Sequence, residues 1–279
     1  MPSWPAVIVG AAVLGAVIGA AQPDDDSVPP DAAPATAAQE QAAASPDSSP
    51  SPVPAPSSER AGPADPPGSS RQAARWPSGV ASTLPGQTDP PRIALTFDDG
   101  PDPRWTPRVL DVLARHDVTA TFCLVGEQVA GREQILERIH REGHVLCNHS
   151  TTHDYGLAAG DPEQVTGEID MATRLVAQAV PQAEVTAFRA PAGRFAPGVV
   201  DEARDLGLDS WGWSVDSLDW NTDNSDRIVT TVLDGIAPGA VVLLHDGGGD
   251  RSATVAALAE IIPVLASVGY EFVGLPDLP

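Results

Sequence analysis

The stretch RIALTFDDGP, residues 92–101, decides the fold, because an apolar strand runs directly into two adjacent carboxylates and a Gly-Pro turn. Two like charges at the end of a buried strand disfavour joint ionisation. Such a pair persists mainly where its members share a cation or a proton. Asp98 and Asp99 therefore predict a cation site. The alternative is that the motif forms only a polar turn.

A second motif, HSTTH at residues 149–153, supplies two imidazoles. His149 and His153 lie four residues apart, a common spacing for two ligands of one transition metal. Taken alone, this motif is also compatible with a solvated loop. Because each motif follows its own predicted strand, the two together favour an open catalytic metal site with one carboxylate and two imidazole ligands.

From residue 92 to the C-terminus, short apolar runs alternate with amphipathic segments. The runs predict strands at 93–97, 120–125, 144–147, 186–188, 210–215, 240–244 and 270–273. Helices are predicted to begin near Thr106, Asp161 and Ser225, and Pro263 is expected to kink or split the last helix. Repeated strand-helix units predict an α/β fold, a parallel sheet closed or nearly closed into a barrel of about seven strands.

Chemistry in such barrels lies on the loops that follow the carboxyl ends of the strands. The unusual polar residues of this chain occupy those positions. We therefore expect them to share one rim: Asp98 and Asp99 after the first predicted strand, His149 and His153 after the third, Arg189 after the fourth, Asp216 to Trp220 after the fifth and His245 after the sixth.

The composition divides the chain into three segments. Residues 1–21 are nearly continuously apolar and are typical of a secretory signal peptide; an uncleaved membrane anchor is the alternative, because no Arg or Lys precedes the apolar run. Residues 22–91 are rich in Pro, Ala, Ser and Asp and predict a disordered linker. Residues 92–279 then form the folded catalytic domain, which we expect to be secreted or tethered to the outer face of the cell membrane.

The charge of the chain excludes several classes of function. Its net charge is -22, and no lysine occurs in the sequence. Nucleic acid is therefore not expected as a partner, and neither Schiff-base lysine chemistry nor a Walker-type phosphate loop is available. No pattern in the sequence indicates an oligomer interface, and we expect a monomer.

The chain contains only two cysteines, Cys123 and Cys147, and each lies in a predicted strand. In an exported protein they could form one disulfide, although neighbouring parallel strands are awkward for that geometry. Two free buried thiols are the alternative. A catalytic role is not expected for either residue.

Five motifs in order make the chain from about Arg92 to Val273 resemble the polysaccharide deacetylases of the NodB-homology type. They are TFDDG at 96–100, His-x3-His at 149–153, Arg-x-Pro-x-Gly at 189–193, Asp-x-x-Asp-Trp at 216–220 and Leu-x-His at 243–245. The resemblance implies a distorted, incomplete β/α barrel, which agrees with the strand count.

The resemblance also implies roles for individual residues. Asp99, His149 and His153 would hold a divalent metal, expected to be zinc. Asp98 would act as general base, held by Arg189, and His245 as general acid, oriented by Asp219. Trp220 and Leu243 would wall a pocket for the acetyl methyl group, and a backbone N–H near Ala192 would stabilise the oxyanion. Arg189 as a simple rim ion pair and Trp220 as an ordinary core residue are the alternatives.

Three functions follow as hypotheses. The first is removal of N-acetyl groups from a GlcNAc-containing glycan, with peptidoglycan or a chitooligosaccharide as substrate. The second is an esterase that removes O-acetyl groups from xylan. The third is a catalytically silent glycan-binding module, which the intact Asp98 and His245 disfavour. One departure from the family is Ala192, where an aromatic residue is usual, and the glycine-rich segment 246–251 is expected to be a mobile loop bordering the cleft.

Overall fold

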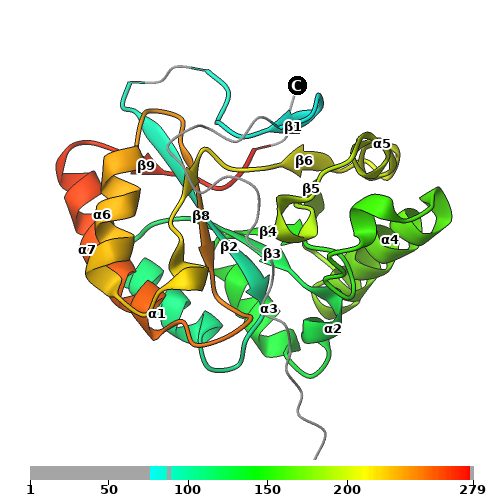
Figure 1. Cartoon of the computed structure of the whole chain (residues 1–279). Helices are drawn as coiled ribbons and strands as arrows, with labels where there is room; N and C mark the ends of the chain where they lie inside the picture. The colour runs from blue at the N-terminus through cyan, green and yellow to red at the C-terminus, as the bar shows by residue number, and fades with distance from the viewer. Residues whose placement is uncertain (1–75, 87–88, 277–279) are drawn as a thin grey trace, which may run out of the picture. The chain divides into compact units, whose positions relative to one another are not determined.

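A parallel β-sheet curled into an incomplete barrel organises the computed structural model, which describes residues 76–86 and 89–276 (Figure 1). Along the sheet the strand order is β1-β6-β5-β4-β3-β2-β8-β7, and β9 pairs with the start of β2. The α/β barrel expected from the sequence is therefore confirmed. The strands are β1 (Val80–Ala81), β2 (Arg92–Gly100), β3 (Thr121–Leu124), β4 (Val145–Asn148), β5 (Val185–Phe188), β6 (Asp209–Trp211), β7 (Val215–Asp216), β8 (Val241–His245) and β9 (Glu271–Phe272).

The helices form a layer outside the sheet (Figure 1). Neighbours in this layer follow the order α6, α7, α1, α3, α4, α5. They are α1 (Thr106–His116), α2 (Gly126–Val129), α3 (Glu133–Arg141), α4 (Pro162–Ala179), α5 (Pro197–Asp205), α6 (Ser225–Gly235) and α7 (Ser252–Ser267), with short 3-10 turns η1 (Leu157–Ala159), η2 (Pro191–Gly193) and η3 (Asp219–Asn221). The three expected helix starts are confirmed, whereas α7 continues through Pro263 without being split.

Alternation along β2 decides which side chains reach the barrel interior. Ile93, Leu95 and Phe97 belong to the large core under the helices, so the intervening positions face inward. Ala94 accordingly packs in a separate interior cluster with inward residues of β3, β4 and β8. By the same alternation Asp98, the last inward residue of β2, points into the barrel.

The predicted strand at 210–215 is two strands on different parts of the sheet. β6 pairs with β5 and β1, whereas β7 pairs with β8 at the opposite margin. Between them the chain crosses the opening of the barrel, where Gly212 N donates to Ala81 O (2.8 Å) and Ser214 N donates to Val241 O (3.0 Å). The continuous run predicts one strand, but the chain leaves the sheet after β6 and rejoins it at β7, on the far side of the opening.

The folded domain begins earlier than residue 92, so the predicted linker boundary at residue 91 is wrong. Trp76 stacks edge-on against Trp213, with ring centroids 4.7 Å apart, and its Nε1 donates to Trp213 O (3.0 Å). β1 pairs with β6, and Leu84 is buried. These residues anchor the segment before β2 to the barrel.

The expected signal peptide or anchor (1–21) and the linker up to residue 75 lie outside the described residues. Within residues 76–86 and 89–276, none of the helices is both long enough and apolar enough to cross a bilayer.

Candidate active site

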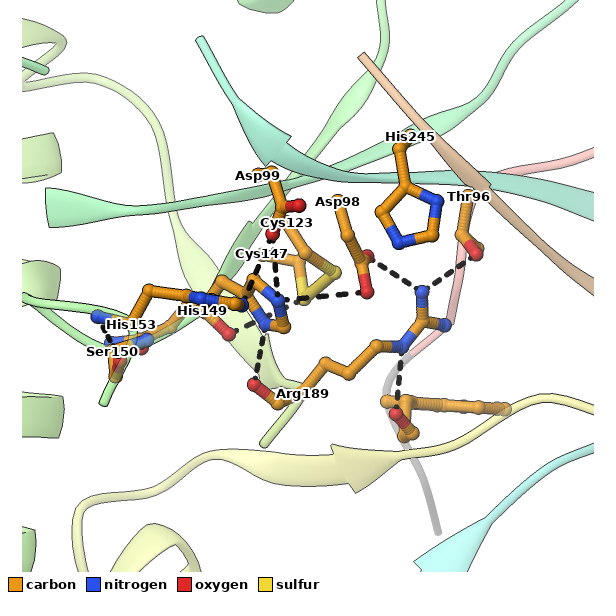
Figure 2. A network of polar contacts seen from close by, with 12 residues as sticks. Thr96, Asp98, Asp99, Cys123, Cys147, His149, Ser150, His153, Arg189 and His245 are labelled. Atoms are coloured by element: carbon orange, nitrogen blue, oxygen red, sulfur yellow. Dashed lines mark hydrogen bonds and ion pairs between the residues drawn. A yellow bond between two sulfur atoms is a disulfide. The ribbon is translucent and has the colours of Figure 1, made fainter. Parts of the chain in front are cut away.

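Three predicted metal ligands converge at the carboxyl end of β2 and β4 (Figure 2). Asp99 Oδ1 lies 3.5 Å from His149 Nε2 and 3.1 Å from His153 Nε2. Their candidate ligand atoms all lie within 4.8 Å of one another. Asp99 and His153 both have positive φ angles (71° and 58°), so the backbone turns sharply at the end of β2 and in the loop after β4 and brings these side chains together.

Hydrogen bonds orient the side chains of this cluster and favour the ionised form of Asp99. His149 Nδ1 lies 2.8 Å from Arg189 O, and this contact fixes the ring so that Nε2 faces Asp99. Burial by itself raises the pKa of Asp99, but hydrogen bonds from His149 and His153 outweigh it and hold this pKa well below its usual range. Asp99 is therefore an ionised carboxylate beside two imidazoles.

Arg189 is a buried ion-pair partner of Asp98 rather than a rim residue. Its Nη1 donates to Asp98 Oδ1 (2.8 Å) and to Thr96 Oγ1 (2.8 Å), and the residue is fully buried. Its Nε and Nη2 donate to the main-chain carbonyls of Trp211 and Gly212, each at 3.0 Å. Figure 2 shows the guanidinium reaching across the barrel interior to Asp98. The second carboxylate oxygen of Asp98 remains on the side of His149, 3.7 Å from its Nε2.

His245 and Asp219 form a second pair on the other side of Asp98. His245 is the register partner of Asp98 in the β2–β8 pairing. Its Nδ1 lies 2.7 Å from Asp219 Oδ1, while its main-chain N and Thr254 Oγ1 both donate to Asp219 Oδ2 (2.9 and 2.8 Å). Burial opposes the charge on His245, but the charge and hydrogen bond of Asp219 raise the pKa of His245 to about 9.

One pocket of about 260 Å³ opens onto these groups. Asp98, Asp99, both metal-site histidines and His245 line it, and so do the three residues predicted to touch substrate, Trp220, Leu243 and Ala192. Arg189 and Asp219 lie behind the residues that they hold. The structure thus brings all ten predicted site residues together.

Ala192 presents a main-chain donor to this pocket. Its φ is +52°, and its N–H forms no hydrogen bond with the residues that the structure describes. The donor does not depend on the side chain, so the alanine preserves it. The next residue must be glycine, because a Cβ at Gly193 would lie 2.5 Å from the Trp213 ring.

Two aromatic residues of the pocket were not predicted. Trp213 packs between Trp76 and Arg189, whose Cζ lies 5.7 Å from the Trp213 ring centroid. Tyr155 stacks edge-on against His153, with centroids 5.1 Å apart. No motif marks either residue, although Tyr155 lies only two positions after a predicted ligand.

Cys123 and Cys147 form a disulfide in the barrel interior, which resolves the alternative left by the sequence. They are direct partners in the β3–β4 register, and Cys123 is also the register partner of Asp98. Figure 2 shows the disulfide beside the site, close to Asp98 and His149. It therefore links β3 directly to β4, the strand that His149 follows.

Asp246 opens the segment expected to be a mobile loop, yet it is fully buried. Its Oδ2 accepts from Thr106 Oγ1 (2.5 Å), and its main-chain N donates to Asp98 O (3.1 Å). Burial raises the pKa of Asp246 to about 7. The loop that borders the pocket therefore begins at a buried, hydrogen-bonded residue. Further along this loop, Gly248 and Arg251 line the pocket, as expected for this segment.

Comparisons with known proteins agree with this geometry. The polysaccharide deacetylase family matches residues 85–211. A chitooligosaccharide deacetylase from Bradyrhizobium sp. (strain ANU 289) is 43% identical over 197 residues, 67% of this chain and 90% of that protein. A peptidoglycan-N-acetylglucosamine deacetylase from Bacillus cereus is 39% identical over 188 residues, 67% of this chain and 87% of that protein. The crystal structure of the Bc1960 peptidoglycan N-acetylglucosamine deacetylase has a TM-score of 0.67 at 36% identity, covering 71% of this chain and 91% of that one.

Proposed function

Because the chain belongs to the polysaccharide deacetylase family, we propose that it hydrolyses the N-acetyl groups of GlcNAc units in peptidoglycan or a chitooligosaccharide. The observation that carries this proposal is the single pocket onto which the Asp99–His149–His153 cluster, Asp98 and His245 all open. A carboxylate base, an imidazolium acid and a candidate metal site around one cavity are the groups that amide hydrolysis requires.

The donor set of the cluster fits a divalent transition metal. Asp99, His149 and His153 offer one carboxylate oxygen and two imidazole nitrogens, and the hydrogen bond from His149 to Arg189 O provides the outer support usual for a ligating histidine. We propose that these residues hold zinc, because three such ligands with an open position are the pattern of catalytic zinc sites. When bound, the metal supplies Lewis acidity toward a water molecule and the acetyl carbonyl.

The reaction begins with proton removal by Asp98. Its free carboxylate oxygen faces the ligand cluster, where it can accept a proton from the water that attacks the acetyl carbonyl carbon. Arg189 fixes the orientation of this carboxylate through Oδ1 and so keeps Oδ2 available as the base. The carbonyl oxygen gains negative charge as the bond forms, and the free N–H of Ala192 can donate to it.

The second step is proton donation by His245. With a pKa of about 9, the imidazole is protonated at neutral pH, and Asp219 holds its Nδ1 so that Nε2 is directed into the pocket. As the C–N bond breaks, His245 gives its proton to the leaving nitrogen. Acetate and a free amine leave, and proton exchange with solvent restores Asp98 and His245. Trp220 and Leu243 supply apolar surface for the acetyl methyl group.

We propose further that the substrate carries N-acetyl rather than O-acetyl groups and that the enzyme is exported. The relatives described above are named as deacetylases of chitooligosaccharide or of peptidoglycan N-acetylglucosamine, which supports N-deacetylation over the acetylxylan esterase alternative. The apolar segment 1–21 and the Pro-rich segment that follows it support a secreted or membrane-tethered enzyme that acts on an extracellular glycan. The Asp98 carboxylate held by Arg189 and the His245 imidazole paired with Asp219 are unnecessary in a silent binding module.

Acetate release by the purified full-length chain tests this proposal. We would compare chitooligosaccharides, peptidoglycan and acetylated xylan as substrates, each at equal acetyl concentration. We expect acetate from the GlcNAc substrates, with an equal amount of newly formed amine. Acetate from xylan alone would replace the proposal with the esterase. An absence of acetate from all three would contradict hydrolysis and support the silent module.

A further inference from the structure

A second pocket of about 400 Å³ adjoins the catalytic pocket. It lies between the η3 turn that follows β7 and the loop that follows β8, and Asn221 and Thr222 line one side. Trp220, Gly248 and Arg251 line both pockets. The two cavities are therefore neighbours along one surface, and the second falls within the size range of small-ligand sites, about 300–1,000 Å³.

Arg251, on the wall common to both pockets, is a buried cation that acts on the nearby Asp219 through its charge but makes no direct ion pair with it. It is only 6% exposed, yet its guanidinium forms no ion pair with a carboxylate of the residues that the structure describes. Its Nε donates to Gly247 O (2.7 Å), and its Nη1 makes a longer contact with Asp219 O (3.5 Å). Its Nη2 forms no hydrogen bond within the described part of the chain. Nη2 is not one of the polar atoms sealed from solvent without a partner, so it is exposed at the pocket wall and can donate to a group from outside the chain.

The backbone next to Arg251 keeps this donor accessible from the catalytic pocket. A Cβ on Gly248 would lie 3.4 Å from Arg251 Nη2 and 2.6 Å from Asp99 Oδ2. Gly248, with φ +71°, therefore occupies the space between the guanidinium and the predicted metal ligand without a side chain. A chain of sugars that places one unit at Asp99 would bring its neighbour to Arg251.

We propose that Arg251 binds the sugar unit next to the GlcNAc that is deacetylated, and that the second pocket receives this neighbouring unit. This inference rests on the proposed function. Nη2 donates to an acetamido carbonyl of the neighbour, a good acceptor that N-acetylated sugars share. Asp223 and Asp250 on the wall of the second pocket are exposed, which favours a neutral acetamido group over a carboxylate. The pair of pockets then makes the enzyme selective for oligosaccharides over the monosaccharide.

The test compares kcat/KM for acetate release from GlcNAc and from its tetramer. For Arg251→Gln in the full-length chain, we expect the preference for the tetramer to fall about tenfold, mainly through a higher KM, because one charge-assisted hydrogen bond to substrate is lost. Arg227→Gln, which removes an exposed arginine on α6, is the matched control and should keep the wild-type preference.

A second variant distinguishes sugar binding at the second pocket from the contact by which Arg251 supports Asp219. Asn221→Trp fills the second pocket from its exposed side while leaving Arg251 in place, and we expect the same loss of preference. An equal fall in kcat for both substrates with unchanged KM in Arg251→Gln would overturn the inference, and so would a wild-type enzyme without preference for the tetramer.

Binding provides a readout that does not depend on catalysis. The tetramer should bind Arg251→Gln about tenfold more weakly than the wild type, monitored through tryptophan fluorescence. Suppose that Arg251→Gln binds the tetramer about tenfold more weakly than the wild type, but the wild type releases no acetate. The proposed function then fails, while binding of a sugar unit by Arg251 stands. If the two proteins bind equally, the inference fails.

Discussion

Replacing Asp219 by Asn should move the basic limb of the pH profile to lower pH. The pKa of His245 is raised from 6.5 to about 9. Burial alone would lower this pKa, and the charge and hydrogen bond of Asp219 are the largest causes that raise it. The shift corresponds to roughly 3 kcal/mol in favour of the imidazolium. In Asp219→Asn the burial remains while the main compensating charge is gone. The pKa should then fall to about 6.5 or below, leaving about a tenth of His245 protonated at pH 7.5.

The assay is kcat/KM for acetate release between pH 5.5 and 10. Wild-type activity should decline above about pH 9, whereas Asp219→Asn should decline near neutrality and recover when the pH is lowered. Asp226→Asn, an exposed acid at the start of α6, serves as the control. An unchanged basic limb in Asp219→Asn would refute the assignment of His245 as the acid held by Asp219.

The same pair predicts how stability depends on pH. Because the pKa of His245 is higher in the folded than in the unfolded chain, its stabilising contribution is complete below about pH 6.5 and is lost as the pH rises through about 9. The wild-type free energy of unfolding should therefore decrease across that range. Asp219→Asn should lack this decrease, and a parallel decrease in both proteins would contradict the argument.

Further substitutions test other parts of the site. Arg189→Met should lower the free energy of unfolding by about 3–5 kcal/mol in urea titrations, because it leaves Asp98 buried without its ion-pair partner; a loss below 1 kcal/mol would contradict this. Removing the disulfide by Cys123→Ala with Cys147→Ala should cost about 3 kcal/mol for a separation of 24 residues, and wild type treated with reductant should match the double variant. Asp98→Asn should lower kcat about 10²- to 10⁴-fold with metal content unchanged, and retained activity would exclude it as the base.

The position of the site could be predicted from the sequence because it follows from strand ends. In a parallel barrel the residues after each strand meet at one rim, so Asp99, His149 and His245 needed only correct strand assignments. The inward direction of Asp98 likewise follows from alternation along β2. The motifs therefore predicted both the fold and the members of the cluster.

Other features depend on packing between segments that no local pattern connects. The disulfide depends on the register that pairs Cys123 with Cys147, which spacing alone does not determine. The split of the run 210–215 depends on where the sheet ends. The Pro-rich sequence around Trp76 predicts a linker, whereas its ring packs against Trp213, which is distant in the sequence. Thr254 supports Asp219 from a helix without any motif.

The most direct test of the central claim is metal-dependent acetate release. The full-length chain would be stripped with a chelator, assayed on a chitooligosaccharide and on peptidoglycan, and assayed again after addition of one equivalent of zinc, in parallel with Asp99→Ala. We predict that stripping abolishes acetate release, that zinc restores it in the wild type, and that Asp99→Ala neither retains zinc nor recovers activity. Full activity of the stripped enzyme, or unaltered zinc content and activity in Asp99→Ala, would contradict the account.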